Sequence, residues 1–437
     1  MKPRGGRVEG GLASAGRFRA AVGVLKGCQG SSIVASAGED QSRGPVGPAA
    51  VLPRKGKLMT TTAASKGLAG IIAAETQMSY IDGEQGILEY VGIPIGELSA
   101  HSNFEETVFL LWNKRLPTGS ELDRFTEQLR DAYELPAGMG NRLMALPMNA
   151  HPMHVLRTMV SALSMHDRNP NAIDIPTARQ KALNILGHAP TLIANFDRYR
   201  QGRPLVNPRK DLSFAANFLY MLNGKEPTET MERAFDICMI LHADHGLNNS
   251  TFAARVVIST LSDVYSAITA AIGSLRGPLH GGANEGVMHM LNEIPSVEDA
   301  ERYVLDRLAN KEKVMGFGHR VYKAKDPRAK DLQKLAEQLA KDTGNEELYA
   351  KSHAIEQVME REVASKGIYP NVDFYSATTY HCIGLDLDLF TPMFAMSRIG
   401  GWAGHIIEQL EDNKLYRPGA EYVGPHDSAY TPIGKRG

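Results

Sequence analysis

Apolar residues recur at helical spacing through most of the chain beyond residue 100, and this pattern restricts the fold more than any other feature. In residues 328–344 the apolar stripe includes Leu332, Leu335 and Leu339, which fall on one face of a helix. Gly344 follows the stripe, and glycine commonly ends a helix. Repeated through a chain of 437 residues, the pattern predicts a mainly helical protein.

Signals for β-strands are few and concentrate in one short stretch before the helical region. Residues 80–95 read YIDGEQGILEYVGIPI, in which the turn-forming pair Asp82 and Gly83 lies between short apolar runs. The sequence therefore predicts a small N-terminal β element. Because 437 residues are too many for one hydrophobic core, we also expect at least two domains.

Residues 1–58 differ in composition from the rest of the chain. Up to residue 57 there are ten lysines and arginines, against only three acids, Glu9, Glu39 and Asp40. Such a segment has two interpretations, an organelle transit peptide or a disordered leader extension upstream of Met59. We favour the second interpretation and leave the segment out of the fold argument.

Charge and cysteine content restrict the partners and the compartment. The formal net charge is −1, so nothing in the overall charge favours a nucleic-acid or membrane partner. No run of 18 apolar residues occurs. The three cysteines, Cys28, Cys238 and Cys382, are scattered, which argues for a reducing compartment and against disulfides or a cysteine zinc site. We expect a cytoplasmic protein, with an organelle matrix as the alternative if the leader is a transit peptide.

Two histidines lie three residues apart in LHADHGLNNSTFAAR, residues 241–255. On a helix, His242 and His245 would share a face and could begin a metal site, but the HExxH spacing is absent and no third ligand is nearby. We interpret His242 as a neutral core histidine. His245 precedes Gly246 and two asparagines, so we place it at a helix end facing a cavity.

Two further histidines stand in glycine-rich loops. In GPLHGGANEG, residues 277–286, glycines around His280 would let a ligand approach the main chain. In MGFGHRVYKAKDPR, residues 315–328, His319 is followed by a cluster of lysines and arginines that suits a phosphate or carboxylate ligand. The second loop lacks the third glycine of a dinucleotide fingerprint and the GK[ST] of a P-loop.

The last segment, YPNVDFYSA, places one acid near a predicted helix start. Pro370 and Asn371 mark that start, and Asp373 lies in or just before the first turn. An acid in this position ordinarily compensates the helix dipole. Residue chemistry alone therefore leaves Asp373 open between a capping role and a functional one.

Taken in order, these segments resemble the citrate synthase family. The four motifs are HADH (242–245), GPLHGGANE (277–285), GFGHRVYKAKDPR (316–328) and PNVD (370–373). The resemblance continues in the β element and in AHPM (150–153), SRIGGW (397–402) and YRPGA (416–420). It covers the chain from about residue 67 to the C-terminus. The implied fold has two helical domains: a large one at 59–279, a small one at 280–380, and a C-terminal return to the large domain at 381–437.

The resemblance also implies a reaction, the condensation of acetyl-CoA with oxaloacetate to citrate. In it, Asp373 would remove a methyl proton from acetyl-CoA. His280, neutral and with its other nitrogen held by a backbone partner, would stabilise the enol or enolate. His319 would polarise the oxaloacetate ketone and protonate the alkoxide. No metal and no bound cofactor is implied, since acetyl-CoA is a substrate.

The family pattern further implies the substrate contacts. Oxaloacetate would bind His245, Arg328, Arg398 and Arg417, with Arg417 reaching the partner's site in a homodimer. The CoA contacts would be Val314, Met315, Gly316, Phe317, Gly318 and Lys323.

Three alternatives stay open at this point. A 2-methylcitrate synthase would use propionyl-CoA with the same catalytic residues. A metal-dependent hydrolase would be built on His242 and His245. A catalytically silent relative would serve only as a binding or scaffold protein, although all three catalytic positions hold competent residues.

Overall fold

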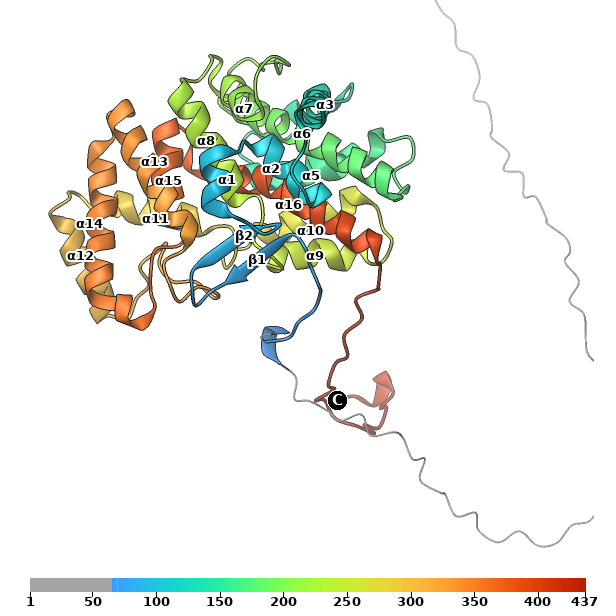
Figure 1. Ribbon diagram of the computed structural model, residues 1–437. Coiled ribbons are helices and arrows are strands. Elements are labelled where there is room, and N and C mark those ends of the chain that lie inside the picture. Colours follow the sequence, from blue (N-terminus) through green and yellow to red (C-terminus); the bar gives the residue numbers. More distant parts are fainter. Residues whose placement is uncertain (1–64, 69) are drawn as a thin grey trace, which may run out of the picture. The chain divides into compact units, whose positions relative to one another are not determined.

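The computed structural model describes residues 65–68 and 70–437, and within them α-helices predominate (Figure 1). The prediction of a mainly helical fold is therefore confirmed. The expectation of a leader at residues 1–58 lies outside the described residues. In the part of the chain that is described, no helix is long and apolar enough to span a membrane.

The described residues form sixteen α-helices. Their bounds are α1 (Ile95–His101), α2 (Phe104–Asn113), α3 (Gly119–Asp131), α4 (Met139–Met144), α5 (Pro152–Leu163), α6 (Ile175–Arg200), α7 (Phe214–Asn223), α8 (Glu229–His242), α9 (Asn249–Ile258), α10 (Val264–Leu275), α11 (Ala283–Glu293), α12 (Asp299–Ala309), α13 (Pro327–Thr343), α14 (Glu346–Val363), α15 (Val372–Ile383) and α16 (Phe390–Glu411). Short 3-10 helices lie at Lys66–Leu68, Ser164–His166, Ala364–Lys366, Leu387–Leu389 and Ile433–Lys435.

The predicted β element is a small antiparallel sheet with the strand order β1-β2-β3. Its strands are β1 (Ser79–Asp82), β2 (Ile87–Tyr90) and β3 (Ile93–Pro94). The turn after β1 forms because the carboxylate of Asp82 accepts the backbone N–H groups of Glu84 and Gln85, each at 3.0 Å. The turn chemistry expected for this stretch is thus present.

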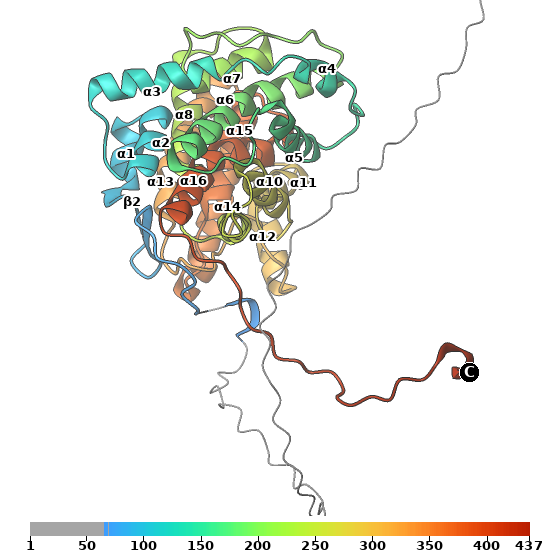
Figure 2. The ribbon, with the colours of Figure 1, turned by 90° about the vertical axis from the view of Figure 1, so that its right-hand side faces the viewer.

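Helix α16 is the centre of the core. Nearly all of its side chains are buried, and it packs against α2, α5, α6, α8, α9 and α10. Figure 2 shows α16 running among these helices. Its glycines allow close packing: a Cβ on Gly401 would lie 2.1 Å from the carbonyl oxygen of Ala243. This close contact holds α16, which carries Arg398, against the chain segment that follows α8.

A second group of helices, α11 to α15, lies on the left of Figure 1, where α13 and α11 pack on α15 and α12 packs on α14. The stripe predicted in residues 328–344 forms α13. Asp326 caps its first turn, and Gly344 ends it with φ of 72°. The domain boundaries at 59–279, 280–380 and 381–437 stay a prediction.

Candidate active site

His245, three residues beyond the end of α8, faces a second histidine from the GFG loop. The ring of His245 lies 5.3 Å from the ring of His319, measured between centroids. Its Nε2 lies 3.1 Å from the hydroxyl of Tyr322. Burial, followed by the positive charge of Arg328, lowers the pKa of His245, so the ring is neutral at pH 7. The two motifs that contain these histidines therefore meet in the fold.

The protonation of His319 follows from its backbone contacts. Its Nδ1 accepts the N–H groups of Val321 at 3.0 Å and Tyr322 at 3.1 Å. Because a backbone N–H can only donate, Nδ1 carries no hydrogen. Burial, aided by Arg328, lowers the pKa of His319 to about 4. Neutral His319 therefore carries its hydrogen on Nε2, where it can donate to a carbonyl oxygen.

His280 lies between α10 and α11 and, like His319, accepts a hydrogen bond from a backbone N–H group, here from the first turn of α9. Its Nε2 accepts the backbone N–H of Ser250 at 3.3 Å and lies 2.9 Å from the Ser250 hydroxyl. This is the backbone partner expected for His280. Burial, aided by Arg398, lowers the pKa of His280 to about 4, so its one hydrogen lies on Nδ1. The position directly after His280 requires glycine, since a Cβ on Gly281 would lie 2.4 Å from the carbonyl oxygen of Leu275.

Asp373 occupies the first turn of α15, as predicted, after the N-cap Asn371. Asn371 accepts the Asp373 backbone N–H at 3.0 Å. Burial raises the pKa of Asp373 to about 7, although Arg328 and Arg398 both oppose the rise. A carboxylate with this pKa is a stronger base than an ordinary aspartate. Asp373 therefore combines a place in the first turn of α15 with the raised pKa of a buried carboxylate.

The GFG loop is fastened to the segment that leads into α15. Gly316 accepts the N–H of Asn371 at 2.9 Å, and Gly318 donates its N–H to Tyr369 at 2.9 Å. The side chain of Asn371 donates to the carbonyl of Gly318 at 3.0 Å. Both glycines have positive φ, 81° and 84°. Residues 314–318, predicted to contact CoA, thus lie beside the helix that carries Asp373.

Two buried arginines supply positive charge to the same site. Arg328 forms a two-pronged ion pair with Asp326, at 3.0 and 2.7 Å. Arg398 donates Nε to the carbonyl of His242 at 2.6 Å, and its guanidinium lies 4.6 Å from the ring centroid of Phe394. Within the described residues Arg398 makes no ion pair, so its terminal nitrogens are available to an anion.

Six of the seven residues predicted for catalysis and oxaloacetate binding are therefore linked by contact or by charge. They are His245, His280, His319, Arg328, Arg398 and Asp373. The seventh, Arg417, is exposed on the segment after α16, which leaves the helical body in Figures 1 and 2. The preceding Tyr416 packs on Phe252 at 5.5 Å. Lys323 is also exposed, and its N–H donates to Gly83 at 2.8 Å.

The metal-site alternative depends on His242, which lies in the core. It is fully buried, and its Nδ1 lies 2.7 Å from the carbonyl of Cys238. Burial lowers its pKa to about 3. The interpretation of His242 as a neutral core histidine is confirmed. No group of three His, Cys, Asp or Glu side chains placed to hold a metal ion occurs among the residues that the structure describes.

Sequence reasoning missed the residues that orient the histidines. Tyr322 contacts both His245 and His319, and its place three residues after His319 in the motif was the available signal. Ser250 receives a hydrogen bond from Trp402 at 3.1 Å and contacts His280. No local sequence pattern indicates that Ser250, His280 and Trp402 lie close together.

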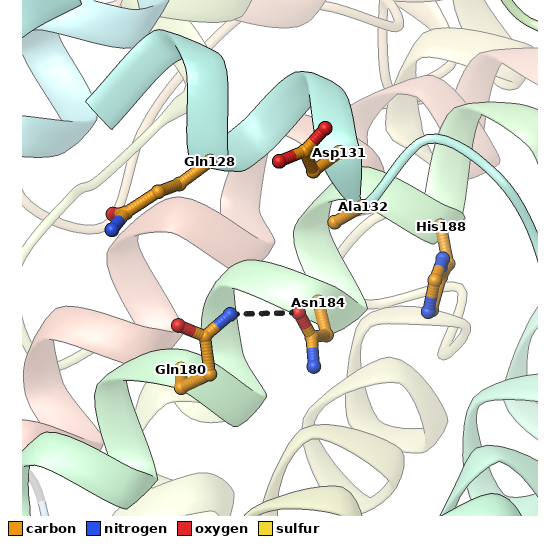
Figure 3. Close-up of a pocket in the computed structure, with 6 residues that line it drawn as sticks. All are labelled: Gln128, Asp131, Ala132, Gln180, Asn184 and His188. Atoms are coloured by element: carbon orange, nitrogen blue, oxygen red, sulfur yellow. Dashed lines mark hydrogen bonds between the residues drawn. The ribbon is translucent and has the colours of Figure 1, made fainter. Parts of the chain in front are cut away.

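A separate surface depression of about 350 Å³ lies between α3 and α6 (Figure 3). Its lining is polar and consists of Gln128, Asp131, Ala132, Gln180, Asn184 and His188. None of these residues belongs to the motifs singled out above. The candidate active site is therefore the cluster around the three histidines and Asp373.

Comparison with known proteins decides the family. Residues 67–419 match the family described as "Citrate synthase, C-terminal domain". The chain belongs to the citrate synthase family. The match covers the motifs that carry the resemblance, except for the last residue of YRPGA, and it covers the site described above.

Individual citrate synthases resemble the chain over most of its length. "Citrate synthase 2" of Bacillus subtilis is 47% identical over 374 residues, which are 85% of this chain and 99% of the relative. "2-methylcitrate synthase" of Mycobacterium tuberculosis is 43% identical over 368 residues, 84% of this chain and 92% of the relative. The citrate synthase of Thermoplasma acidophilum, solved as a ternary complex with carboxymethyl coenzyme A and oxaloacetate, superposes with a TM-score of 0.82 at 35% identity. That match covers 86% of this chain and all of the solved chain.

Proposed function

We propose that the protein condenses acetyl-CoA with oxaloacetate and water to give citrate and CoA. The observation that carries this proposal is the pairing of a basic carboxylate, Asp373 with a pKa of about 7, with two neutral histidines whose free hydrogens are defined by backbone donors. Such a set can remove a weakly acidic proton and stabilise the oxyanions that follow.

The first step removes a proton from the methyl group of acetyl-CoA. A thioester methyl is a much weaker acid than a carboxylic acid, so the carboxylate of Asp373 needs help to complete the transfer. His280 supplies it by donating Nδ1–H to the thioester oxygen, which becomes the enol or enolate oxygen. The raised pKa of Asp373 also reduces the difference between the pKa of the base and the pKa of the methyl group.

The second step forms the carbon–carbon bond. The enol carbon attacks the ketone carbon of oxaloacetate, while Nε2–H of His319 polarises the ketone and then protonates the new alkoxide. Water hydrolyses the resulting citryl-CoA, which gives citrate and the free CoA thiol. Every charge that develops has a protein partner, so the scheme requires no metal or bound cofactor.

Oxaloacetate carries two carboxylates, which call for forked cationic donors. Arg398 has unpaired donors, and Arg328 and His245 lie in the same site. We assign Arg417 to the site of a second copy of the chain, so the functional unit is a homodimer. CoA would lie along residues 314–318 and Lys323.

Closure of two domains would complete the site. In this proposal residues 280–380 carry His319, Arg328 and Asp373, and the large domain carries His245 and Arg398. Closing after oxaloacetate binds would assemble the base and exclude water until the carbon–carbon bond has formed.

A second candidate is 2-methylcitrate synthase activity with propionyl-CoA. It is favoured by the relative of that name, which is 43% identical to this chain. The catalytic residues serve both reactions, and one methylene in a pocket changes selectivity by only about 1–3 kcal/mol. The acyl pocket therefore decides between the two.

A thiol-release assay tests the proposal. Acetyl-CoA and propionyl-CoA are each supplied with and without oxaloacetate, to protein treated with a chelator. We expect oxaloacetate-dependent thiol release with the higher kcat/KM for acetyl-CoA. A clear propionyl-CoA preference would replace the first function by the second. Loss of activity on chelation would instead favour a metal-dependent enzyme.

A further inference from the structure

One carboxylate outside the catalytic set lies between two residues of the oxaloacetate site. Asp244 is fully buried, precedes His245 in the chain, and interacts electrostatically with Arg398. We propose that Asp244 is a positioning residue that prepares His245 and Arg398 for a dicarboxylate. This inference rests on the proposed function, because it concerns how the same site binds oxaloacetate.

The carboxylate of Asp244 fixes the backbone on both sides of His245. Its Oδ2 accepts the N–H of Gly246 at 3.1 Å, which closes a turn with His245 as the middle residue. The same oxygen accepts the hydroxyl of Ser79 at 2.5 Å, and that hydroxyl oxygen also accepts the Gly246 N–H at 3.0 Å. The turn around His245 is thereby attached to strand β1.

The other carboxylate oxygen faces a histidine of α16. Oδ1 lies 3.2 Å from Nε2 of His405, and both side chains are completely buried. Burial opposes the charge on His405, but Asp244 and Glu408 outweigh it and raise the pKa of the imidazole. Arg255 completes the cluster, with Nη1 2.8 Å from Glu408. Asp244, His405, Glu408 and Arg255 thus form one buried cluster in which each acid lies beside a basic side chain.

The same cluster affects Arg398. Burial lowers the pKa of Arg398 to about 10, and Asp244 is the first of the groups that oppose this loss. Arg398 also donates to the carbonyl of His242, two residues before Asp244. The segment between these residues contacts α16 closely, because a Cβ on Gly401 would lie 2.9 Å from Oδ1 of Asp244. Asp244 therefore helps to hold Arg398 in position and favours its charged form.

A further contact holds the backbone of this segment. The hydroxyl of Tyr90, a fully buried residue of β2, accepts the N–H of Asp244 at 3.0 Å and lies 2.8 Å from its carbonyl oxygen. The backbone is thus held by Tyr90 and the side chain by Ser79 and His405. Replacing Asp244 by asparagine keeps the backbone contacts with Tyr90 but removes the negative charge that faces His405 and acts on Arg398.

The test compares Asp244→Asn with a matched control. Asp236→Asn changes another buried carboxylate of the same region, about two turns earlier on α8, where it accepts the N–H of Phe104 at 2.9 Å and pairs with Arg233. Oxaloacetate binding is measured by calorimetry, and KM and kcat by thiol release, below the melting temperature of each variant. We expect Asp244→Asn to weaken oxaloacetate binding by about tenfold or more, because small misplacements of binding groups have large effects. In Asp244→Asn, KM for acetyl-CoA at saturating oxaloacetate should change by less than about threefold, since acetyl-CoA binding does not depend on Asp244. Every constant of Asp236→Asn should also stay within about threefold, because this variant leaves Asp244 in place.

Ser79→Ala provides a milder second variant, which keeps the charge of Asp244 and removes two hydrogen bonds, the one donated to Asp244 and the one accepted from Gly246. It should weaken oxaloacetate binding measurably but less than Asp244→Asn. If Asp244→Asn does not fold, unchanged oxaloacetate binding by Ser79→Ala overturns the inference. Unchanged binding by a folded Asp244→Asn does the same. If wild-type protein binds oxaloacetate but releases no thiol, only the proposed function is overturned. The comparison of oxaloacetate binding between the variants then still tests the positioning role of Asp244.

Discussion

The backbone N–H of Ser250 points at Nε2 of His280 across 3.3 Å. Ser250 lies in the first turn of α9, where the N–H groups have no partner within the helix and the helix dipole is positive. This arrangement disfavours a second proton on the imidazole. His280 can therefore donate from Nδ1 as a neutral group.

His280 should remain neutral through the physiological pH range. With ¹³C-labelled histidine, its NMR signal, assigned by its absence in His280→Asn, should titrate near pH 4 and not near 6.5. Since the folded pKa is lowered, the stability contributed by the neutral ring is complete above pH 6.5 and falls as the pH drops toward 4. A titration midpoint near 6.5 would contradict the proposed donor role.

The ionised carboxylate of Asp373 should lower the free energy of unfolding above about pH 7. Its pKa is raised from 3.8 to about 7, so the folded protein holds this proton more tightly than the unfolded chain does. The stabilisation that comes from this tighter proton binding is fully present below pH 3.8 and is lost as the pH rises through 7. At pH 8, Asp373→Asn should raise the free energy of unfolding by about 1 kcal/mol or more. Denaturant unfolding at pH 8 and pH 5 checks this, and the gain should be smaller at pH 5.

Two glycines of the GFG loop form a matched pair. Both have positive φ, but a Cβ on Gly316 would lie 2.8 Å from Phe374 and from Val287, whereas Gly318 has open space around it. Gly318→Ala should cost about 1–2 kcal/mol from backbone strain alone. Gly316→Ala should cost about 1–3 kcal/mol more from overpacking, and should raise KM for acetyl-CoA. Equal effects of the two substitutions on stability and KM would contradict the assigned loop geometry.

Arg417 should act in the partner's site. Arg417→Ala and His280→Ala should each be poorly active alone, whereas a mixed dimer of the two contains one site with both residues intact. A purified mixed dimer should therefore recover about half of the wild-type activity. Differential tags allow the mixed dimer to be isolated. If the mixed dimer recovers no activity, Arg417 acts in the site of its own chain or in neither site, and the assignment to the partner's site is wrong.

Periodicity and motif chemistry predicted much of the fold and the site. The stripe at residues 328–344 became α13, and the turn at Asp82 became the turn of the small sheet. These predictions succeed because helix periods and turn residues are local signals. The two histidine loops could be singled out for the same reason, since a histidine among glycines is a local signal of a turn.

The remaining features depend on contacts between distant segments. The hydrogen bond from Ser250 to His280, and the contact of Asp244 with His405, join positions that no local pattern relates. The raised pKa of Asp373 comes from burial, which only the folded chain creates. For that reason residue chemistry alone left Asp373 open between a capping role and a functional one.

The role of Asp373 as the base is the central claim, and one measurement tests it most directly. Thiol release from acetyl-CoA in the presence of oxaloacetate is compared between wild type and Asp373→Asn, with oxaloacetate binding measured on the same samples. We predict that the substitution lowers kcat by about 10²- to 10⁴-fold while oxaloacetate still binds. Near-normal turnover by Asp373→Asn would contradict the account.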